Sequence, residues 1–225
     1  MDDFKDAVDK YITDNFKIKN DSMLHIVYGK LGLFNLVSGY IPKMYIYGDK
    51  LNIDGVDSEF FLLEITSLRF DMNFFNENKE LKFIEGAKFK LYAEFSEKNI
   101  NNMIQDKKNR SNLKEPYIKF EKDYVLVKGY YKSRFISSSL STRATFILKD
   151  DKTVYIDADY LKVGFFKLPA FIVNSIEKNV NPILDLNKMA FDLSLSEINI
   201  SDERLVISSF EGYNREKIDE LINTL

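Results

Sequence analysis

Apolar residues recur at every second position in four stretches of the chain, and this alternation limits the possible folds more than any other feature. The apolar members are Leu68, Phe70, Met72 and Phe74, then Phe89, Leu91, Ala93 and Phe95, then Ala144, Phe146 and Leu148, and finally Val154, Ile156, Ala158 and Tyr160. A period of two is typical of strands with one buried and one solvated face, as in antiparallel sheets. We therefore expect mostly antiparallel strands, with intervening residues such as Tyr92 and Glu94 facing water.

Helical periodicity is restricted to a few segments. Residues 2–16 and 214–225 each carry an apolar stripe, which predicts amphipathic terminal helices, the second capped by Asn214. Residues 96–109, capped by Ser96, and residues 168–179, with Pro169 in the first turn, are expected to form internal helices. The whole pattern predicts a single α+β domain over residues 1–225, built on a long curved antiparallel sheet.

The composition excludes several kinds of site. The chain has no Cys and a single His, which excludes disulfides, thiolate metal sites, cysteine nucleophiles and multi-histidine metal sites. We expect no metal and no cofactor, and we interpret His25 as a structural residue of a strand. The formal net charge of −3 argues against nucleic acid as a partner, since phosphate binding needs a basic surface.

Polar clusters support only weaker functional hypotheses. Acidic pairs such as Asp57 with Glu59 can serve a carboxylate-based hydrolase, but nothing singles out two carboxylates. We therefore expect no enzyme and keep the hydrolase as the second alternative. The basic run of Lys107, Lys108, Arg110 and Lys114 and the serine-rich residues 137–142 can each contact a phosphate. The preferred interpretations are a solvated helix end for the first stretch and a polar strand edge or hairpin for the second.

Aromatic residues are the remaining signal, with 19 Phe and 13 Tyr. Such residues ordinarily form the core of a protein. A curved sheet with few helices must nevertheless close its concave apolar face. Side chains alone can fill that space, or a bound acyl chain can occupy it.

Several motifs of the chain occur together in one protein family. Residues 160–169 read YLKVGFFKLP, the expected helix follows, and residues 181–186 read NPILDL, with FDLSL at 191–195 and INISDERLVI at 198–207. In the amino-terminal half, LVSG at 36–39 and IDGV at 53–56 precede paired strands and SEKNI at 96–100. In this order of features the chain resembles the LmeA-like phospholipid-binding family from about residue 12 to residue 210.

The resemblance implies a TULIP-like fold, in which the curved sheet wraps around one or two helices and encloses an acyl-chain groove. It also implies a protein of the bacterial envelope, without catalytic residues, that is secreted or anchored through a segment preceding the first helix. Because the sequence opens directly with that helix, a cytoplasmic location is the alternative. The expected ligand is a phospholipid or another fatty-acyl lipid, with peripheral membrane contact.

The residues expected to line the groove are apolar positions of the strands and of the helix at 168–179. They are Leu68, Phe70, Met72, Phe74, Phe89, Leu91, Phe146, Leu148, Phe165, Leu168, Phe171, Ile172, Ile176 and Phe191. The first alternative is a non-enzymatic scaffold or interaction protein with the same fold and a dry core.

Overall fold

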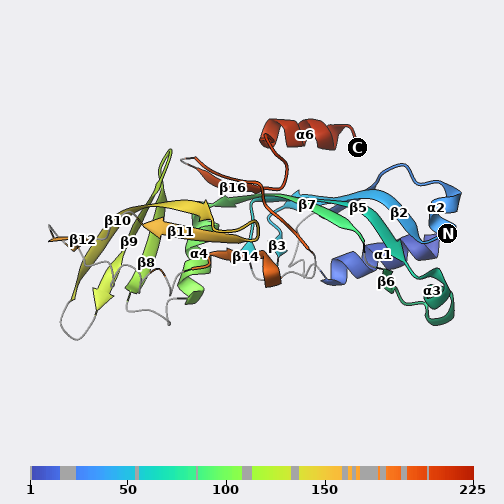
Figure 1. Cartoon of the computed structure of the whole chain (residues 1–225), viewed down its shortest axis with the longest axis horizontal. Helices are drawn as coiled ribbons and strands as arrows, with labels where there is room; N and C mark the ends of the chain where they lie inside the picture. Colours follow the sequence, from blue (N-terminus) through green and yellow to red (C-terminus); the bar gives the residue numbers. More distant parts are fainter. Residues whose placement is uncertain are drawn as a thin grey trace. The chain divides into compact units, whose positions relative to one another are not determined.

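The computed structural model describes residues 2–15, 24–53, 56–84, 86–107, 113–132, 137–158, 162–163, 166–167, 177, 181–188, 192–201 and 203–225. The fold is α+β with mostly antiparallel sheets, one of them strongly curved into a half-barrel (Figure 1), which confirms the predicted class. The chain forms two compact units. Unit 1 comprises Met1–Ala93, Phe191–Ser194 and Ser208–Leu225, and unit 2 comprises Glu94–Ala190 and Leu195–Ile207. The single domain over residues 1–225 stays a prediction.

Unit 1 combines antiparallel strands with four of the described helices. The helices are α1 (Asp2–Asn15), α2 (Leu33–Val37), α3 (Met72–Asn78) and α6 (Arg215–Asn223). The strands are β1 (Leu24–Tyr28), β2 (Tyr40–Asp49), β3 (Asn52–Ile53), β4 (Val56–Asp57), β5 (Phe60–Phe70), β6 (Phe83–Ile84) and β7 (Lys88–Ser96), which passes into unit 2 after Ala93. Strand β2 lies between β1 and β5, and β6 pairs with the end of β5.

Unit 2 holds one described helix, α4 (Glu97–Lys107), and the short 3-10 helix η2 (Leu186–Lys188). Its strands are β8 (Leu113–Phe120), β9 (Val125–Lys132), β10 (Ser137–Leu148), β11 (Thr153–Ala158), β12 (Lys162–Val163), β13 (Phe166–Lys167), β14 (Leu184–Asp185), β15 (Glu197–Ile200) and β16 (Arg204–Ser208), whose last residue belongs to unit 1. The long strand β10 pairs with β9, β11 and β12, and β8 forms an edge that pairs with β9 among the described residues.

The alternation that predicted antiparallel strands is clearest in β10. Leu140, Thr142, Ala144 and Phe146 are buried, while the residues that alternate with them are exposed. The serine-rich residues 137–142 lie in the same strand and form a hairpin with β9, which confirms that part of the interpretation. Leu140 and Ser141 also pair with β12, so these two residues do not lie at a sheet edge.

Strand β5 begins earlier than the alternation indicates. The predicted strand opened at Ser67, but β5 starts at Phe60, and its residues from Phe60 to Ile65 are all buried. A strand covered on both faces has a continuous apolar run, so the period of two is lost there.

The predicted strand through Met72 and Phe74 is wrong at its end, because α3 begins at Met72. The Asp71 carboxylate accepts a hydrogen bond from the Phe74 backbone N–H at 3.1 Å and so caps the helix. An N-cap carboxylate satisfies a backbone donor that a strand would place in the ladder.

The solvated face expected for β7 is also wrong at Tyr92 and Glu94, which are each 1% exposed. The Tyr92 ring makes an edge contact with Phe60, with centroids 6.2 Å apart, and the guanidinium of Arg215 at the start of α6 lies 3.9 Å from the Phe60 ring centre. A side chain of the C-terminal helix therefore packs on a ring that in turn contacts Tyr92, a residue that the local pattern assigns to water.

Three predicted helices are confirmed among the described residues, as α1, α4 and α6. The Ser96 hydroxyl accepts a hydrogen bond from the Asn99 backbone N–H at 3.3 Å, and the Asn214 side chain accepts one from Lys217 N–H at 3.1 Å. Both predicted caps are thus in place. The fourth predicted helix, at 168–179, falls almost wholly outside the described residues. No helix that the structure describes has the length and hydrophobicity to span a bilayer.

Helix α2 and its exit through Gly39 were not predicted. Gly39 has a φ of +65°, the left-handed conformation typical of a glycine after a helix. A Cβ at this position would lie 2.6 Å from the Phe70 carbonyl oxygen and 2.6 Å from Met72 Cγ. The Gly39 carbonyl also accepts a hydrogen bond from Phe70 N–H at 2.8 Å. The absence of a side chain therefore lets the turn after α2 pack directly on the end of β5.

Candidate functional site

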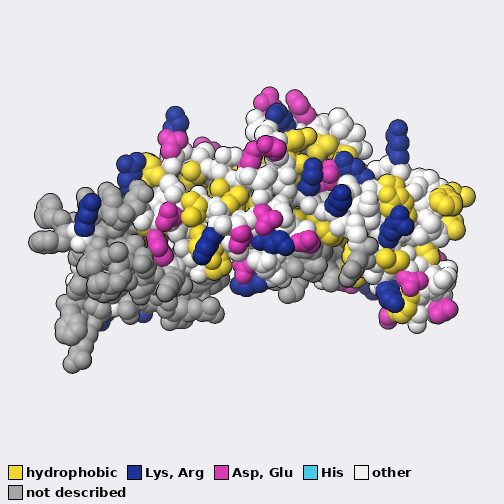
Figure 2. Space-filling view, in the orientation of Figure 1, with side chains coloured by type: hydrophobic (Ala, Val, Ile, Leu, Met, Phe, Trp, Pro, Cys, Tyr) yellow, Lys and Arg dark blue, Asp and Glu magenta, His cyan; other side chains and the backbone are white. Residues whose placement is uncertain are grey.

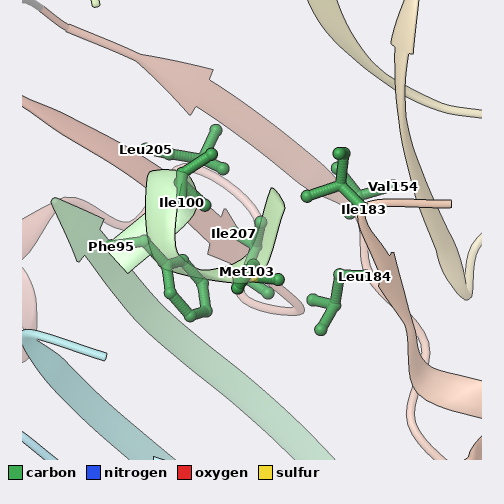
Figure 3. A pocket seen from close by; sticks show the side chains of 8 residues that line it. All are labelled: Phe95, Ile100, Met103, Val154, Ile183, Leu184, Leu205 and Ile207. Atoms are coloured by element: carbon green, nitrogen blue, oxygen red, sulfur yellow. The ribbon is translucent and has the colours of Figure 1, made fainter. Parts of the chain in front are cut away.

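The candidate site is an apolar niche in unit 2. The eight side chains that line it are Phe95, Ile100, Met103, Val154, Ile183, Leu184, Leu205 and Ile207. They come from β7, α4, β11, β14, β16 and the residue before β14, and Figure 3 shows them gathered around a common space. None of the eight side chains carries a charge or a hydrogen-bonding group, so the niche has no affinity for a polar ligand.

One wall of the niche is formed by α4 and the strand before it. The Ser96–Asn99 cap begins the helix immediately after Phe95, and Ile100 and Met103 then follow one turn apart on the same face. Ile100 is buried and Met103 is half-buried, which places Met103 where the wall meets solvent.

The other wall is held by main-chain hydrogen bonds of β11. Ile183 N–H donates to the Val154 carbonyl at 2.8 Å, and the next residue, Leu184, pairs with Val154 in the ladder. The Asn181 side chain extends this contact, since it accepts from Ile156 N–H at 2.8 Å and donates to the Ile156 carbonyl at 2.7 Å. The segment after residue 180 is therefore fixed against β11 in a defined register.

The niche is small. Its cavity volume is about 10 Å³. Pockets for drug-sized ligands are usually about 300–1,000 Å³, and roughly 10–15 Å³ is needed to hold a single water molecule. The side chains of the niche therefore nearly fill it, and the end of an acyl chain can enter only if they move apart.

Polar side chains along one face of α4 form hydrogen bonds with backbone groups of β8. These bonds fix the position of α4, whose apolar face lines the niche. Asn101 donates to the Ile118 carbonyl and accepts from Ile118 N–H, both at 2.7 Å. Glu97 accepts from Phe120 N–H at 2.9 Å, and Gln105 donates to the Pro116 carbonyl at 2.7 Å. The bonding side chains are four residues apart in α4, a rise of about 6 Å, and their backbone partners are two residues apart in β8, a rise of about 6.6 Å. Because these two spacings are nearly equal, all three side chains can reach the strand.

Two further polar contacts are found in unit 2. The Glu94 carboxylate, 1% exposed, pairs with the Arg204 guanidinium across β7 and β16. The Tyr117 hydroxyl donates to Glu97, and this hydrogen bond to a carboxylate raises the pKa of the tyrosine above its usual value. None of the residues that form these two contacts lines the niche, so we assign the contacts to the stability of the fold.

Of the predicted lining residues of unit 1, Phe70 lies in a packed aromatic cluster. Phe70 is buried and makes edge contacts with Phe4 of α1 and Phe83 of β6, at centroid distances of 5.7 and 6.4 Å. Leu68 and Leu91 are also buried, and Met72, Phe74 and Phe89 are half-buried.

Two more predicted lining residues are described in unit 2. Phe146 is buried against Phe120, with ring centroids 6.2 Å apart, and Leu148 is half-buried. The predicted positions Phe165, Leu168, Phe171, Ile172, Ile176 and Phe191 lie outside the described residues. None of the eight described positions lines the niche.

The sequence pattern placed only some of the niche residues. Ile100 and Met103 fall in the helix expected at 96–109, and Phe95 and Val154 are apolar positions of expected strands. Nothing in a one-dimensional pattern separates a position that packs fully from one that borders free space, because that depends on neighbours distant in sequence.

Comparison of the chain with protein-family models, with curated proteins and with solved structures finds no match. The resemblance to the LmeA-like family therefore stays a prediction.

Proposed function

We propose that this protein binds lipid through an acyl chain, and that the niche of unit 2 receives the chain end. The observation that carries the proposal is a lining of eight apolar side chains, of which seven are buried and Met103 is half-buried. Each methylene removed from water stabilises the bound state by about 0.8 kcal/mol, so even a few buried carbons contribute measurable affinity.

The finer parts of the proposal rest on the sequence. A TULIP-like sheet wrapped around the helix at 168–179 would extend the niche into a groove long enough for a phospholipid or fatty acid. A location at the bacterial envelope belongs to the same proposal.

The second candidate is a scaffold or interaction protein with a dry core. The small volume of the niche favours it, as does the complete hydrogen bonding of buried side-chain polar atoms within the described part of the chain. A carboxylate-based hydrolase has less support, because no acidic residue lines the niche.

The Met103→Trp variant tests the acyl-chain proposal, because an indole at the mouth of the niche would occupy its free space. We expect the affinity for a fluorescent 18-carbon fatty acid to fall by about tenfold or more, equivalent to losing two or three buried methylenes. Fluorescence titration of the purified full chain measures the effect. Asn102→Trp is the matched control, since Asn102 is exposed on the same helix and does not line the niche.

Equal fatty-acid affinity in Met103→Trp and wild type would contradict the niche as the binding site. Absence of binding to the wild-type chain, together with no lipid in an organic extract of the purified protein, would favour the dry-core scaffold instead. Thermal melting of both variants separates a blocked niche from a disrupted fold.

A further inference from the structure

Helix α2 of unit 1 carries an exposed apolar surface that the niche does not explain. Leu33, Phe34 and Val37 are 66%, 83% and 68% exposed, the highest values among the large hydrophobic residues that the structure describes. We call these three residues the α2 tip. Figure 2 shows hydrophobic side chains at the surface where α2 lies in Figure 1. Single exposed apolar residues are common, but three within one helical turn form a patch of the kind found at binding sites.

The α2 tip is held in position by local hydrogen bonds. The Asn35 side chain accepts from Gly32 N–H at 3.0 Å, and Ser38 N–H donates to the Phe34 carbonyl at 3.0 Å. The Gly39 turn then fixes the end of the helix against β5. The polar side chains of this segment thus form hydrogen bonds within the segment, whereas its apolar side chains are exposed to solvent.

The charge of the surrounding segment favours an anionic occupant. Residues 24–48 contain no Asp or Glu, although the chain as a whole has 35 acidic residues among 225. The two cations of this segment are Lys43, which pairs with Glu64 at 2.9 Å, and Lys30, which is exposed and forms no ion pair with a described residue. Carboxylates from other elements do contact this segment, since the Tyr28 hydroxyl donates to Asp9 of α1 at 2.6 Å and Lys43 pairs with Glu64 of β5. The cation of the segment that is left for an anionic headgroup is therefore Lys30, three residues before Leu33.

The size of the patch favours a bilayer over a protein partner. An aromatic side chain buries about 150–250 Å², and Leu33 and Val37 are smaller than that, so the three together supply less than about 750 Å². A stable protein interface needs about 800 Å² on each partner, with complementary shape. A bilayer surface needs neither, because apolar side chains enter the boundary between headgroups and acyl chains while cations stay among the headgroups.

We propose that the α2 tip docks the protein onto a bilayer with anionic headgroups, with Leu33, Phe34 and Val37 inserted and Lys30 at the headgroup level. Docking through the α2 tip is a second function, separate from the proposed binding of single acyl chains. It does not require that a ligand occupy the niche.

Sedimentation with vesicles tests the proposal on the purified full chain. We expect more protein to bind vesicles of phosphatidylcholine with 30% phosphatidylglycerol than vesicles of phosphatidylcholine alone. Phe34→Ser should weaken this binding by roughly 10- to 100-fold, the range expected for withdrawing one large apolar side chain. Lys30→Glu should abolish the preference for anionic vesicles. Ile147→Ser is the matched control, since Ile147 is also exposed but lies on β10, and it should bind as wild type.

Three results would overturn the proposal. The first is no binding of the wild type to either vesicle, and the second is an equal loss in Phe34→Ser and Ile147→Ser. The third is a dimer in light scattering that Phe34→Ser dissociates, which would make a second copy of the chain the occupant. Fatty-acid titration separates the two proposals: Phe34→Ser should keep wild-type uptake, and Met103→Trp should keep wild-type vesicle binding.

Discussion

Replacing Gly39 with alanine is expected to lower the free energy of unfolding by about 2–5 kcal/mol. The φ of +65° costs an L-residue about 1–2 kcal/mol. The new Cβ would also lie 2.6 Å from the Phe70 carbonyl oxygen, a backbone atom fixed in β5. Relieving such a contact typically costs a further 1–3 kcal/mol or so, because the strand and the turn must move apart. Urea-induced unfolding followed by circular dichroism measures the change.

Gly212→Ala provides the control for the Gly39 variant. Gly212 has a nearly identical φ of +67°, but a Cβ there meets no atom within 4 Å. We expect this variant to lose only the conformational part, about 1–2 kcal/mol. Equal losses in the two variants would show that the close approach to Phe70 contributes nothing, and that the turn is free to adjust.

Asn101→Leu is expected to destabilise the chain by about 2–4 kcal/mol. The substitution removes the partner of both the N–H and the carbonyl of Ile118, which lie in the buried contact between α4 and the edge of β8. Each buried polar group left without a hydrogen bond costs about 1–3 kcal/mol. Hydrogen exchange of the Ile118 amide should accelerate together with the loss of stability, and both are measured on the same sample.

Asn102→Leu is the matched control for that experiment. The neighbouring residue is exposed, so the same substitution there should change stability by no more than about 0.5 kcal/mol. If the two variants lost stability equally, helix propensity or solubility would explain the effect, and the bonding of α4 to β8 would not.

The parts of the fold that sequence predicted are those whose pattern is local. Half-buried strands such as β10 alternate because water lies on one side, and α6 was located by its stripe and by Asn214, all within one segment. The start of β5 was not predicted, because its residues are buried on both faces of the sheet and apolar residues therefore do not alternate with polar ones there. Tyr92 is buried in contact with Phe60, which lies 32 residues earlier in the chain and which no local pattern around Tyr92 reveals.

The short helices and the niche were missed for related reasons. Helix α2 has five residues, too few for a periodic stripe, and its one local signal is a glycine just past its end. Helix α3 was marked only by the capping residue Asp71. The niche exists because side chains from segments as distant as Phe95 and Leu205 leave space between them, and that space is a property of their packing.

The division of the chain has a consequence for the order in which the protein can fold during synthesis. Unit 2 is largely an insertion: its last residue is Ile207, whereas unit 1 is complete only after residues 208–225 have emerged. Strands β1, β2 and β5 are therefore made before unit 2, whereas helix α6, whose Arg215 lies on the Phe60 ring, is made after it. Until then a long apolar strand is exposed on a growing chain, a state prone to aggregation. Ribosome-bound chains ending before residue 208 should accordingly depend on chaperones.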